Sequence, residues 1–501
     1  MYYSVVFSVM LKIFVKSIAV KISCDNHKNF WQPLYLHKKM SFDIILIARK
    51  KHIKGRWYFI IFFRYFKDYN FDFEKFKSRV HNNVVHIDAY FIPENEVCPT
   101  CGSTLLYKNG HTTKTIKHCT YHTNLFLVKC HIQNYKCKDC NTIFREKISF
   151  ANPNETLSKE SIIIILDKLK YANTTFESVA RDLHISRQNV IDVFDRYIDY
   201  SPGPLPEYLS WDEKHINKSL TENAYMFIML DFKTNKIYDI LYSRHKYRLE
   251  YHFSRLPIEE RLKVKYITMD MWEPYLHIAK IYFKKAKIAI DSFHVMEAVN
   301  NAMNKVRLIV MQKYNRKTEN LDDNHPFYYV LKKYRYYLVK NFDDITNLRF
   351  YNKKLKMWFD KFSLREYLLK IDSRLSLAYD LTTAYRDFNK TASTKDCADE
   401  MDKIIDLFYN SNLEPFKDVA KTLSTWKEYI LNSFIKVEEC LDKDGNPRRL
   451  SNGPIEGINS IIEKINVNGN GYTNFWRFRN RCIYVINKDV PILNTPKKKT
   501  K

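Results

Sequence analysis

Residues 207–300 carry acidic residues at the ends of short apolar runs, and this pattern constrains the fold more than any other feature of the chain. Three β-like runs follow one another, then a helical segment, then two buried-strand runs with an amphipathic helix between them. The fourth run ends at Asp270 and the fifth ends at Asp291. The order βββ-α-β-α-β is that of an RNase H-like fold, so we expect such a catalytic core within a multidomain α/β chain.

Three carboxylates in and beyond this segment have the chemistry of a divalent-metal site. Asp212 follows the first run, Asp270 follows the fourth, and Glu456 lies near the start of a late helix. Mg²⁺ prefers hard oxygen ligands, and two ions about 3.5–4 Å apart can activate a nucleophile and stabilise a leaving oxygen in phosphodiester chemistry. We therefore expect these three side chains to converge, with Glu213 and Glu463 as the alternatives to Asp212 and Glu456.

A long segment with helical periodicity separates Asp270 from Glu456. Apolar residues keep helical spacing through residues 301–445, and no glycine occurs between Gly203 and Gly445. The turn sequence Asp444-Gly445-Asn446-Pro447 ends this segment. We expect an all-helical insertion that interrupts the RNase H-like core.

Residues 446–490 are predicted to return to the core. Asn452-Gly453 is a turn, and the next residues form a helix with an isoleucine stripe beside Glu456. A basic and aromatic segment follows, in which Arg477 and Arg479 are candidate DNA contacts. This part therefore supplies both the last predicted carboxylate and further positive charge.

Two Cys-x-x-Cys pairs predict a structural zinc ribbon over residues 91–150. Thiolates two residues apart can supply four soft ligands in tetrahedral geometry, and an alternating run between the pairs suits a β-hairpin. A closed four-ligand site leaves no position for substrate, so we assign this zinc to folding and DNA docking. The predicted ligands are Cys98, Cys101, Cys137 and Cys140. The alternative ligands between the pairs are His118, Cys119, Cys130 and His131.

Residues 155–200 have the spacing of a helix-turn-helix, with an ordinary helical hairpin as the alternative. His184-Ile185 makes the turn, and Ser186 caps the second helix. That helix presents three polar side chains at its N-terminal end, where recognition helices meet base edges. These candidate DNA contacts are Arg187, Gln188 and Asn189.

The charge balance indicates a polyanionic partner. The 501 residues contain 82 Lys and Arg against 56 Asp and Glu, a formal net charge of +26, and nucleic acid is the first candidate. A hydrophobic content of 45% excludes a disordered chain, and the length indicates several domains.

The termini and the cysteines indicate the cellular compartment in which we expect the protein. No apolar run reaches roughly 18 residues, and the apolar N-terminus lacks a signal-peptide cleavage site, so we expect neither a membrane partner nor secretion. Paired cysteines in a long basic chain indicate a reduced, cytoplasmic protein. Residues 1–90 are either an N-terminal α/β cap or translated upstream sequence, with Met40 as another start. Residues 491–501 form a basic tail.

Over roughly residues 90–485, the chain resembles bacterial insertion-sequence transposases of the DDE type, in the group called the ISL-three family. The N-terminal 90 residues have no clear counterpart, and Ile465-Asn466-Val467-Asn468 replaces basic residues usual at that place. The matching features are the Cys98-Pro99-Thr100-Cys101-Gly102 knuckle with the second cysteine pair, the helix-turn-helix, Asp212-Glu213, Asp270, Asp291-Ser292-Phe293-His294, Ser451-Asn452-Gly453, Glu456-Gly457, Asn459, Gly471-Tyr472, Asn474-Phe475 and Arg477-Phe478-Arg479.

The resemblance implies a DDE triad of Asp212, Asp270 and Glu456, with the helical domain inserted before the glutamate. It also implies an Asp-x-x-His motif, Asp291 and His294, just after the second catalytic aspartate. His294 has the chemistry to hydrogen-bond a phosphate or orient a flanking nucleotide, with capping or packing as the alternative. Asp291 is the runner-up for the second metal ligand.

We therefore expect a transposase that binds the terminal inverted repeats of an insertion sequence through the ribbon and the helix-turn-helix. It would cut and join double-stranded DNA, including target DNA, with two Mg²⁺ or Mn²⁺ ions, and Zn²⁺ would be structural. The family implies a homodimer on paired ends, in the bacterial cytoplasm and associated with the nucleoid. The alternative is a zinc-ribbon and helix-turn-helix regulator whose nuclease fold is inactive.

Overall fold

The computed structural model describes residues 66, 69–72, 74–81, 84–92, 97–119, 125–315, 317 and 325–498. The chain forms two compact units, residues 1–162 and residues 163–501, each with its own hydrophobic core. Residues 1–65, with the alternative start Met40, and the last residues of the basic tail lie outside the described part. None of the helices in the described ranges has the length and apolar character needed to cross a membrane.

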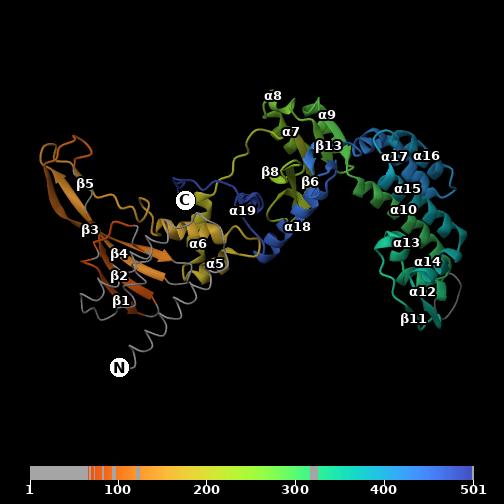
Figure 1. The fold of residues 1–501 in the computed structure, drawn as a ribbon, viewed down its shortest axis with the longest axis horizontal. Coiled ribbons are helices and arrows are strands. Elements are labelled where there is room, and N and C mark those ends of the chain that lie inside the picture. The colour runs from red at the N-terminus through yellow and green to blue at the C-terminus, as the bar shows by residue number, and fades with distance from the viewer. Residues whose placement is uncertain are drawn as a thin grey trace, which may run out of the picture. The chain divides into compact units, whose positions relative to one another are not determined.

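The first unit is built on a sheet in the order β1-β2-β4-β3, with β5 paired to β4 (Figure 1). Strands β2 and β4 run parallel, whereas the other neighbours are antiparallel. In the long hairpin β3–β4, Ile116 and Val128 pair and are fully buried, which explains the alternating apolar pattern. The strands are β1 (Lys77–His81), β2 (Val84–Tyr90), β3 (Leu106–Cys119), β4 (Leu125–Cys137) and β5 (Ile143–Arg145).

Strands β1 and β2 precede residue 91, the expected start of the ribbon. They belong to the same sheet because Ile87 and Ala89 are buried in one core with Val128. The expected boundary at residue 91 is therefore too late, since an apolar strand pairs where it can bury its side chains.

The second unit begins within α4 (Lys159–Lys168), and two helices joined by a tight turn follow. α5 (Phe176–Asp182) opens with a capping box between Thr175 and Ser178. His184 makes the turn with a φ of 55°, and the Ser186 side chain accepts a hydrogen bond from the Asn189 backbone N–H. This cap starts α6 (Arg187–Tyr197), at the position that the sequence predicts.

The core sheet of the second unit has the strand order β10-β9-β6-β7-β8. β6, β7 and β8 form an antiparallel meander, and β9 and β10 continue the sheet parallel to β6. The strands are β6 (Tyr208–His215), β7 (Tyr225–Asp231), β8 (Lys236–Leu241), β9 (Tyr266–Met269) and β10 (Lys287–Ile290). The helices between them are α7 (Lys246–Ser254), α8 (Ile258–Arg261) and α9 (Glu273–Tyr282).

The two faces of β6 differ in chemistry because successive side chains of a strand point to opposite sides. Trp211 is fully buried and its ring stacks on Phe253. Ser210 and Asp212 lie on the other face, where the Ser210 hydroxyl meets Thr268 of β9. The face of β6 that carries Trp211 packs into the apolar core. The face that carries Ser210 and Asp212 is therefore available for a polar site.

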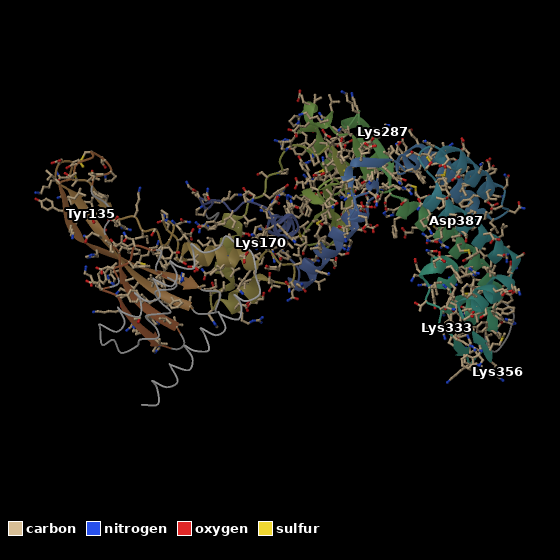
Figure 2. All side chains as sticks on the ribbon, viewed as in Figure 1. Tyr135, Lys170, Lys287, Lys333, Lys356 and Asp387 are labelled. Atoms are coloured by element: carbon tan, nitrogen blue, oxygen red, sulfur yellow. The ribbon has the colours of Figure 1, made fainter. Side chains whose placement is uncertain are left out.

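An insert of about the expected extent follows, but the expectation that it is all-helical is wrong. Two short hairpins, β11–β12 and β13–β14, interrupt the helices, because strands of only a few residues leave little periodicity to recognise. Lys356, in the turn between β11 and β12, lies at the tip of the insert opposite α16 and α17 (Figures 1 and 2). The elements are α10 (Ser292–Lys313), α12 (Pro326–Lys333), α13 (Tyr336–Val339), β11 (Phe350–Asn352), β12 (Met357–Phe359), α14 (Lys361–Lys370), α15 (Ser373–Thr391), α16 (Cys397–Tyr409), α17 (Glu414–Asn432), β13 (Lys436–Leu441) and β14 (Pro447–Arg449).

The chain then returns to the core sheet through two last helices. α18 (Gly453–Asn468) lies against β6, and α19 (Phe475–Asn487) lies against β8. α19 also packs on the α5–α6 helix pair, where the rings of Tyr484 and Phe194 are 5.9 Å apart. The last helix therefore joins the helix pair to the core sheet.

Candidate active site

The carboxyl group of Asp212 is held by its own strand and by α18. One of its oxygens accepts a hydrogen bond of 2.7 Å from the backbone N–H of Glu213. The other accepts one of 2.6 Å from the side-chain amide of Asn459. Asn459 lies three residues after Glu456, so both side chains face the same side of α18. Helix α18 therefore orients Asp212 while it carries Glu456.

The acidic side chains of this site destabilise one another's charge. Burial, and then the negative charge of Asp270, raise the pKa of Asp212 to about 7. Desolvation, followed by the charges of Asp291 and Asp270, raises the pKa of Glu456. Carboxylates that raise one another's pKa concentrate negative charge, which a cation or a cationic side chain can neutralise.

His294 supplies positive charge beside Asp270. Its Nε2 lies 2.9 Å from Oδ1 of Asp270. That hydrogen bond raises the pKa of His294 to about 9, so the imidazole is cationic at neutral pH. Because α10 begins at Ser292, directly after Asp291, the first turn of this helix carries His294 to the end of β9.

Asn452 connects the elements of the site from the N-terminal cap of α18. This buried side chain donates 3.0 Å to the Trp211 carbonyl and 3.1 Å to Oδ1 of Asp270. Its carbonyl oxygen accepts a hydrogen bond of 2.7 Å from the Thr268 hydroxyl, and its backbone N–H donates 3.0 Å to Asp291. Asp270 is thus hydrogen-bonded to Asn452, in the turn that precedes the helix carrying Glu456.

Asp291 is buried, with 2% of its surface exposed, and burial raises its pKa. Its Oδ1 accepts the Asn452 backbone N–H, whereas Oδ2 has no hydrogen-bond partner within the described ranges. It therefore belongs to the same hydrogen-bond network as Asp270, through Asn452, and it is the N-cap residue of α10.

Asp270 interacts electrostatically with both Asp212 and Glu456, but the three predicted carboxylates do not form a closed cage. Among the described residues, the ligand atoms that lie within 4.8 Å of one another belong to the four cysteines alone. Hard oxygen donors from β6, the end of β9 and α18 nevertheless fit a divalent cation, and the pKa values of Asp212 and Glu456 are raised. The alternatives are engaged elsewhere: Glu213 accepts from Arg244 and from Tyr275 (2.8 Å), and Glu463 pairs with Lys214 (2.9 Å).

The sequence places Asn452 and Asn459 in motifs shared with the family, but it did not predict that their side-chain amides hold the carboxylates. Asn459 was detectable as a polar residue on the same helical face as Glu456, and Asn452 as the residue before Gly453 and Pro454. The bonds that these amides make span more than 180 residues of chain and have no local signal.

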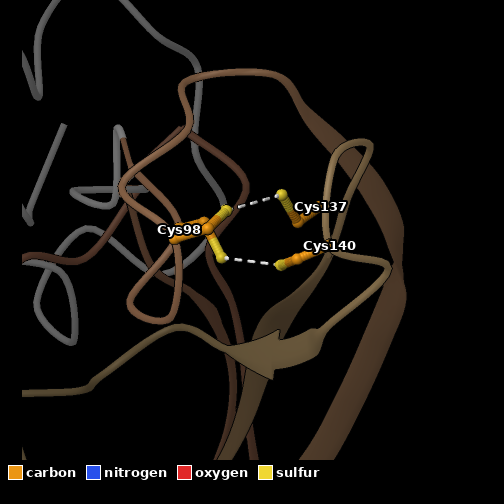
Figure 3. Close-up of side chains that lie close together, drawn as sticks. Cys98, Cys137 and Cys140 are labelled. Atoms are coloured by element: carbon orange, nitrogen blue, oxygen red, sulfur yellow. Dashed lines mark hydrogen bonds between the residues drawn. The ribbon is translucent and has the colours of Figure 1, made fainter.

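The four predicted zinc ligands meet in the first unit (Figure 3). Sγ of Cys98 lies 3.6 Å from Sγ of Cys140, and Sγ of Cys101 lies 3.5 Å from Sγ of Cys137. A tetrahedral site with Zn–S bonds of about 2.3 Å needs sulfurs about 3.8 Å apart, so the group is compatible with structural zinc.

The alternative zinc ligands lie outside this group. Cys119 and Cys130 are buried, and the imidazole of His118 bonds to Ser158 at 2.8 Å. His131 stacks on Tyr90 with ring centroids 4.3 Å apart. These four side chains belong to the packing of the sheet.

The predicted DNA contacts divide into two groups. Arg187 and Gln188 are exposed at the start of α6, and Asn189 beside them is half-buried. Arg477 is held by Asp195 through bonds of 2.7–3.0 Å.

Arg479 is buried, and it donates 2.7 Å to Asp239 and 3.1 Å to the Tyr200 carbonyl. We therefore correct the interpretation of Arg479 as a DNA contact. Because Arg479 lies on the core-facing side of α19, it forms an ion pair with the buried carboxylate of Asp239 instead.

One comparison with known proteins bears on this site. The family model described as a transposase, that of the ISL3 (ISL-three) DDE transposases, matches residues 209–482. The matched segment runs from the first strand of the core sheet, through the insert, into α19. A search of curated proteins found no match.

Proposed function

The chain belongs to the ISL3 family of DDE transposases, and from this membership we propose that it cuts and joins DNA strands at the ends of an insertion sequence. The observation that supports the proposal is that Asp270 lies close enough to interact electrostatically with both Asp212 and Glu456. The three residues come from distant parts of the chain, and Asp270 raises the pKa of both other carboxyl groups. The strand order β10-β9-β6-β7-β8 supports an RNase H-like core around them.

In this proposal Asp212, Asp270 and Glu456 hold two Mg²⁺ or Mn²⁺ ions. The bound ions supply nucleophile activation and stabilisation of the leaving oxygen. Asn459 and Asn452 orient the carboxylates of Asp212 and Asp270.

The remaining charged groups of the site then have supporting roles. The cationic His294 beside Asp270 is placed to bind a phosphate oxygen of the DNA. Asp291 acts as a positioning residue, because it is buried and bonded to Asn452.

The α5–α6 pair is proposed to be the helix-turn-helix that reads the terminal repeat with Arg187, Gln188 and Asn189. The four cysteines would bind structural Zn²⁺ and let the first unit dock on DNA. Two copies on two ends would form the working homodimer, associated with the nucleoid in the bacterial cytoplasm. The large positive charge supports a DNA partner, since lysine and arginine release counterions from DNA phosphates.

A strand-transfer assay with the element's own ends tests the proposal. Wild-type protein should cleave and join these ends in Mg²⁺ or Mn²⁺, and Asp270→Asn or Glu456→Gln should abolish both steps. Glu463→Gln is the matched control, because Glu463 lies on the same helix but pairs with Lys214. Activity that survives in Asp270→Asn would refute the triad. DNA binding without metal-dependent chemistry in the wild type would favour the regulator.

A further inference from the structure

The hairpin β11–β12 presents two faces of opposite character at the tip of the insert. On the inner face Phe350 pairs with Phe359, which is 3% exposed and belongs to the core of the second unit. On the outer face Tyr351 pairs with Trp358, and these side chains are 46% and 59% exposed. Their ring centroids are 5.5 Å apart. The inner face anchors the hairpin in the core, whereas the outer rings contact each other and remain exposed to solvent.

Four basic residues lie in or next to this hairpin, and one of them, Lys354, lies over the Tyr329 ring of α12 at 4.7 Å. Residues 345–359 contain Arg349, Lys353, Lys354 and Lys356 and no acidic residue. The Arg349 guanidinium lies 5.3 Å from the Trp358 ring centroid. Within the described part of the chain, none of these four cations is ion-paired with a carboxylate.

Hydrogen bonds of Asn352 hold the turn between the two strands. The side-chain oxygen of Asn352 accepts hydrogen bonds from the backbone N–H groups of Lys354 and Leu355, at 3.0 and 3.1 Å. Its amide donates 3.0 Å to the Tyr334 hydroxyl, which ties the turn to the rest of the insert. Lys356 completes the turn with a φ of 53°.

Exposed rings and basic side chains that have no carboxylate partner among the described residues suit a ligand that has both π-faces and negative charge. Nucleic acid has both, since bases stack on aromatic side chains while phosphates bind lysine and arginine. A second copy of the same surface would bring like charges together, which disfavours a symmetric contact between copies. Stacking requires a base that is free of its partner, as in a single strand or a frayed end.

We infer that Arg349, Tyr351, Lys353, Lys354, Lys356 and Trp358, here called the hairpin surface, bind unpaired nucleotides of DNA. The rings stack on bases and the basic side chains contact the neighbouring phosphates. This is a second DNA surface, distinct from the α5–α6 pair. It rests on the proposed function only in taking DNA as the polyanion.

Binding of the full chain to a fluorescein-labelled oligothymidylate tests the inference. Trp358→Ala should weaken this binding about tenfold, whereas Trp358→Phe, which keeps a ring, should lose much less. Reversal of Lys353, Lys354 and Lys356 to Glu should lower the salt dependence of binding by roughly two counterions. Lys403→Glu is the control, because this exposed lysine lies on α16, at the other end of the insert.

Two results would overturn the inference. One is unchanged affinity for oligothymidylate in both Trp358→Ala and the triple lysine variant. The other is a change of oligomeric state in light scattering without any change in DNA affinity, which would make the surface a contact between copies. Because the assay needs neither metal nor strand joining, it separates this inference from the proposed function. A wild-type protein without strand transfer could still bind oligothymidylate through the hairpin surface.

Discussion

The side-chain amide of Asn452 donates a hydrogen bond of 3.1 Å to Oδ1 of Asp270, although the two residues are 182 positions apart in the chain. The same amide reaches the Trp211 carbonyl of β6, so it bonds the two strands that carry Asp212 and Asp270. Asn452 also caps α18, on which Glu456 lies. Asn452, where the chain returns to the core after the insert, is therefore hydrogen-bonded directly to Asp270.

Asn452→Asp should impair strand cleavage more than it impairs folding. The new carboxylate lies beside Asp270 and Asp291 and cannot donate to either strand. We expect a loss of metal affinity on the order of 10–100-fold, as for other groups that orient ligands. Mn²⁺ titration of cleavage measures it, and Val419→Ala, a buried truncation in the insert, controls for lost stability. Equal metal dependence in the two variants would refute the role of Asn452.

Arg479→Ala should unfold the second unit more easily rather than weaken DNA binding. Removal of one partner from a buried ion pair leaves Asp239 uncompensated, at a cost of about 3–5 kcal/mol in the free energy of unfolding. Urea denaturation measures this loss, and Arg477→Ala, at a more exposed pair, should cost less. A stable Arg479→Ala protein with weakened DNA affinity would restore Arg479 as a DNA contact.

Arg187→Ala should relax recognition of the terminal repeat. A base contact from the start of α6 contributes roughly 1–3 kcal/mol to discrimination between sequences. Competition between specific and random duplexes at fixed salt measures the discrimination. Arg181→Ala, at an exposed arginine on the preceding helix, should leave it unchanged. Loss of discrimination in both variants would argue against a reading role for the start of α6.

Replacement of Cys137 and Cys140 by serine should remove zinc and loosen the first unit. Two of four ligands are lost, and structural zinc contributes directly to folding. Zinc content by a chromogenic chelator and hydrogen exchange of β3 and β4 measure the two effects. End binding should fall before metal-dependent chemistry on a precut end does. If the serine variant lost metal-dependent chemistry on a precut end while β3 and β4 stayed protected from hydrogen exchange, the assignment of end binding to the first unit and of chemistry to the second would be wrong.

Acid should destabilise the first unit through His118. This imidazole is fully buried, and burial lowers its pKa to about 3, below its value in the unfolded chain. The neutral imidazole favours the folded state, so its contribution is complete above about pH 6.5 and declines as the pH falls towards 3. The decline is at most about 1.4 kcal/mol per pH unit.

Hydrogen exchange of β3 and β4 between pH 7 and pH 5 measures this effect, with zinc content checked at each pH. His118→Gln should flatten the pH dependence, whereas His81→Gln, at an exposed histidine of β1, should not. Equal pH dependence in wild type and His118→Gln would assign the acid sensitivity to another group.

Local chemistry made much of this protein predictable. Ser186 can cap a helix only at its N-terminus, and two Cys-x-x-Cys pairs can close one tetrahedral site, so α6 and the cysteine group were accessible from spacing. The strands before Asp270 and Asp291 were visible as short apolar runs. Each of these signals operates between residues close in the chain.

The amino-acid sequence by itself thus determined the element order of the core, the cysteine group and the helix pair, and it identified the three carboxylates that are proposed as metal ligands. Tertiary structure alone decided that Arg479 is buried against Asp239, that β1 and β2 join the first sheet, and that Asn452 bonds Asp270. It also decided that Trp358 is exposed while Phe359 is buried. The reason is that helical and strand periodicity act over a few residues. A side chain's partner across 180 residues or more depends on how folded elements pack together.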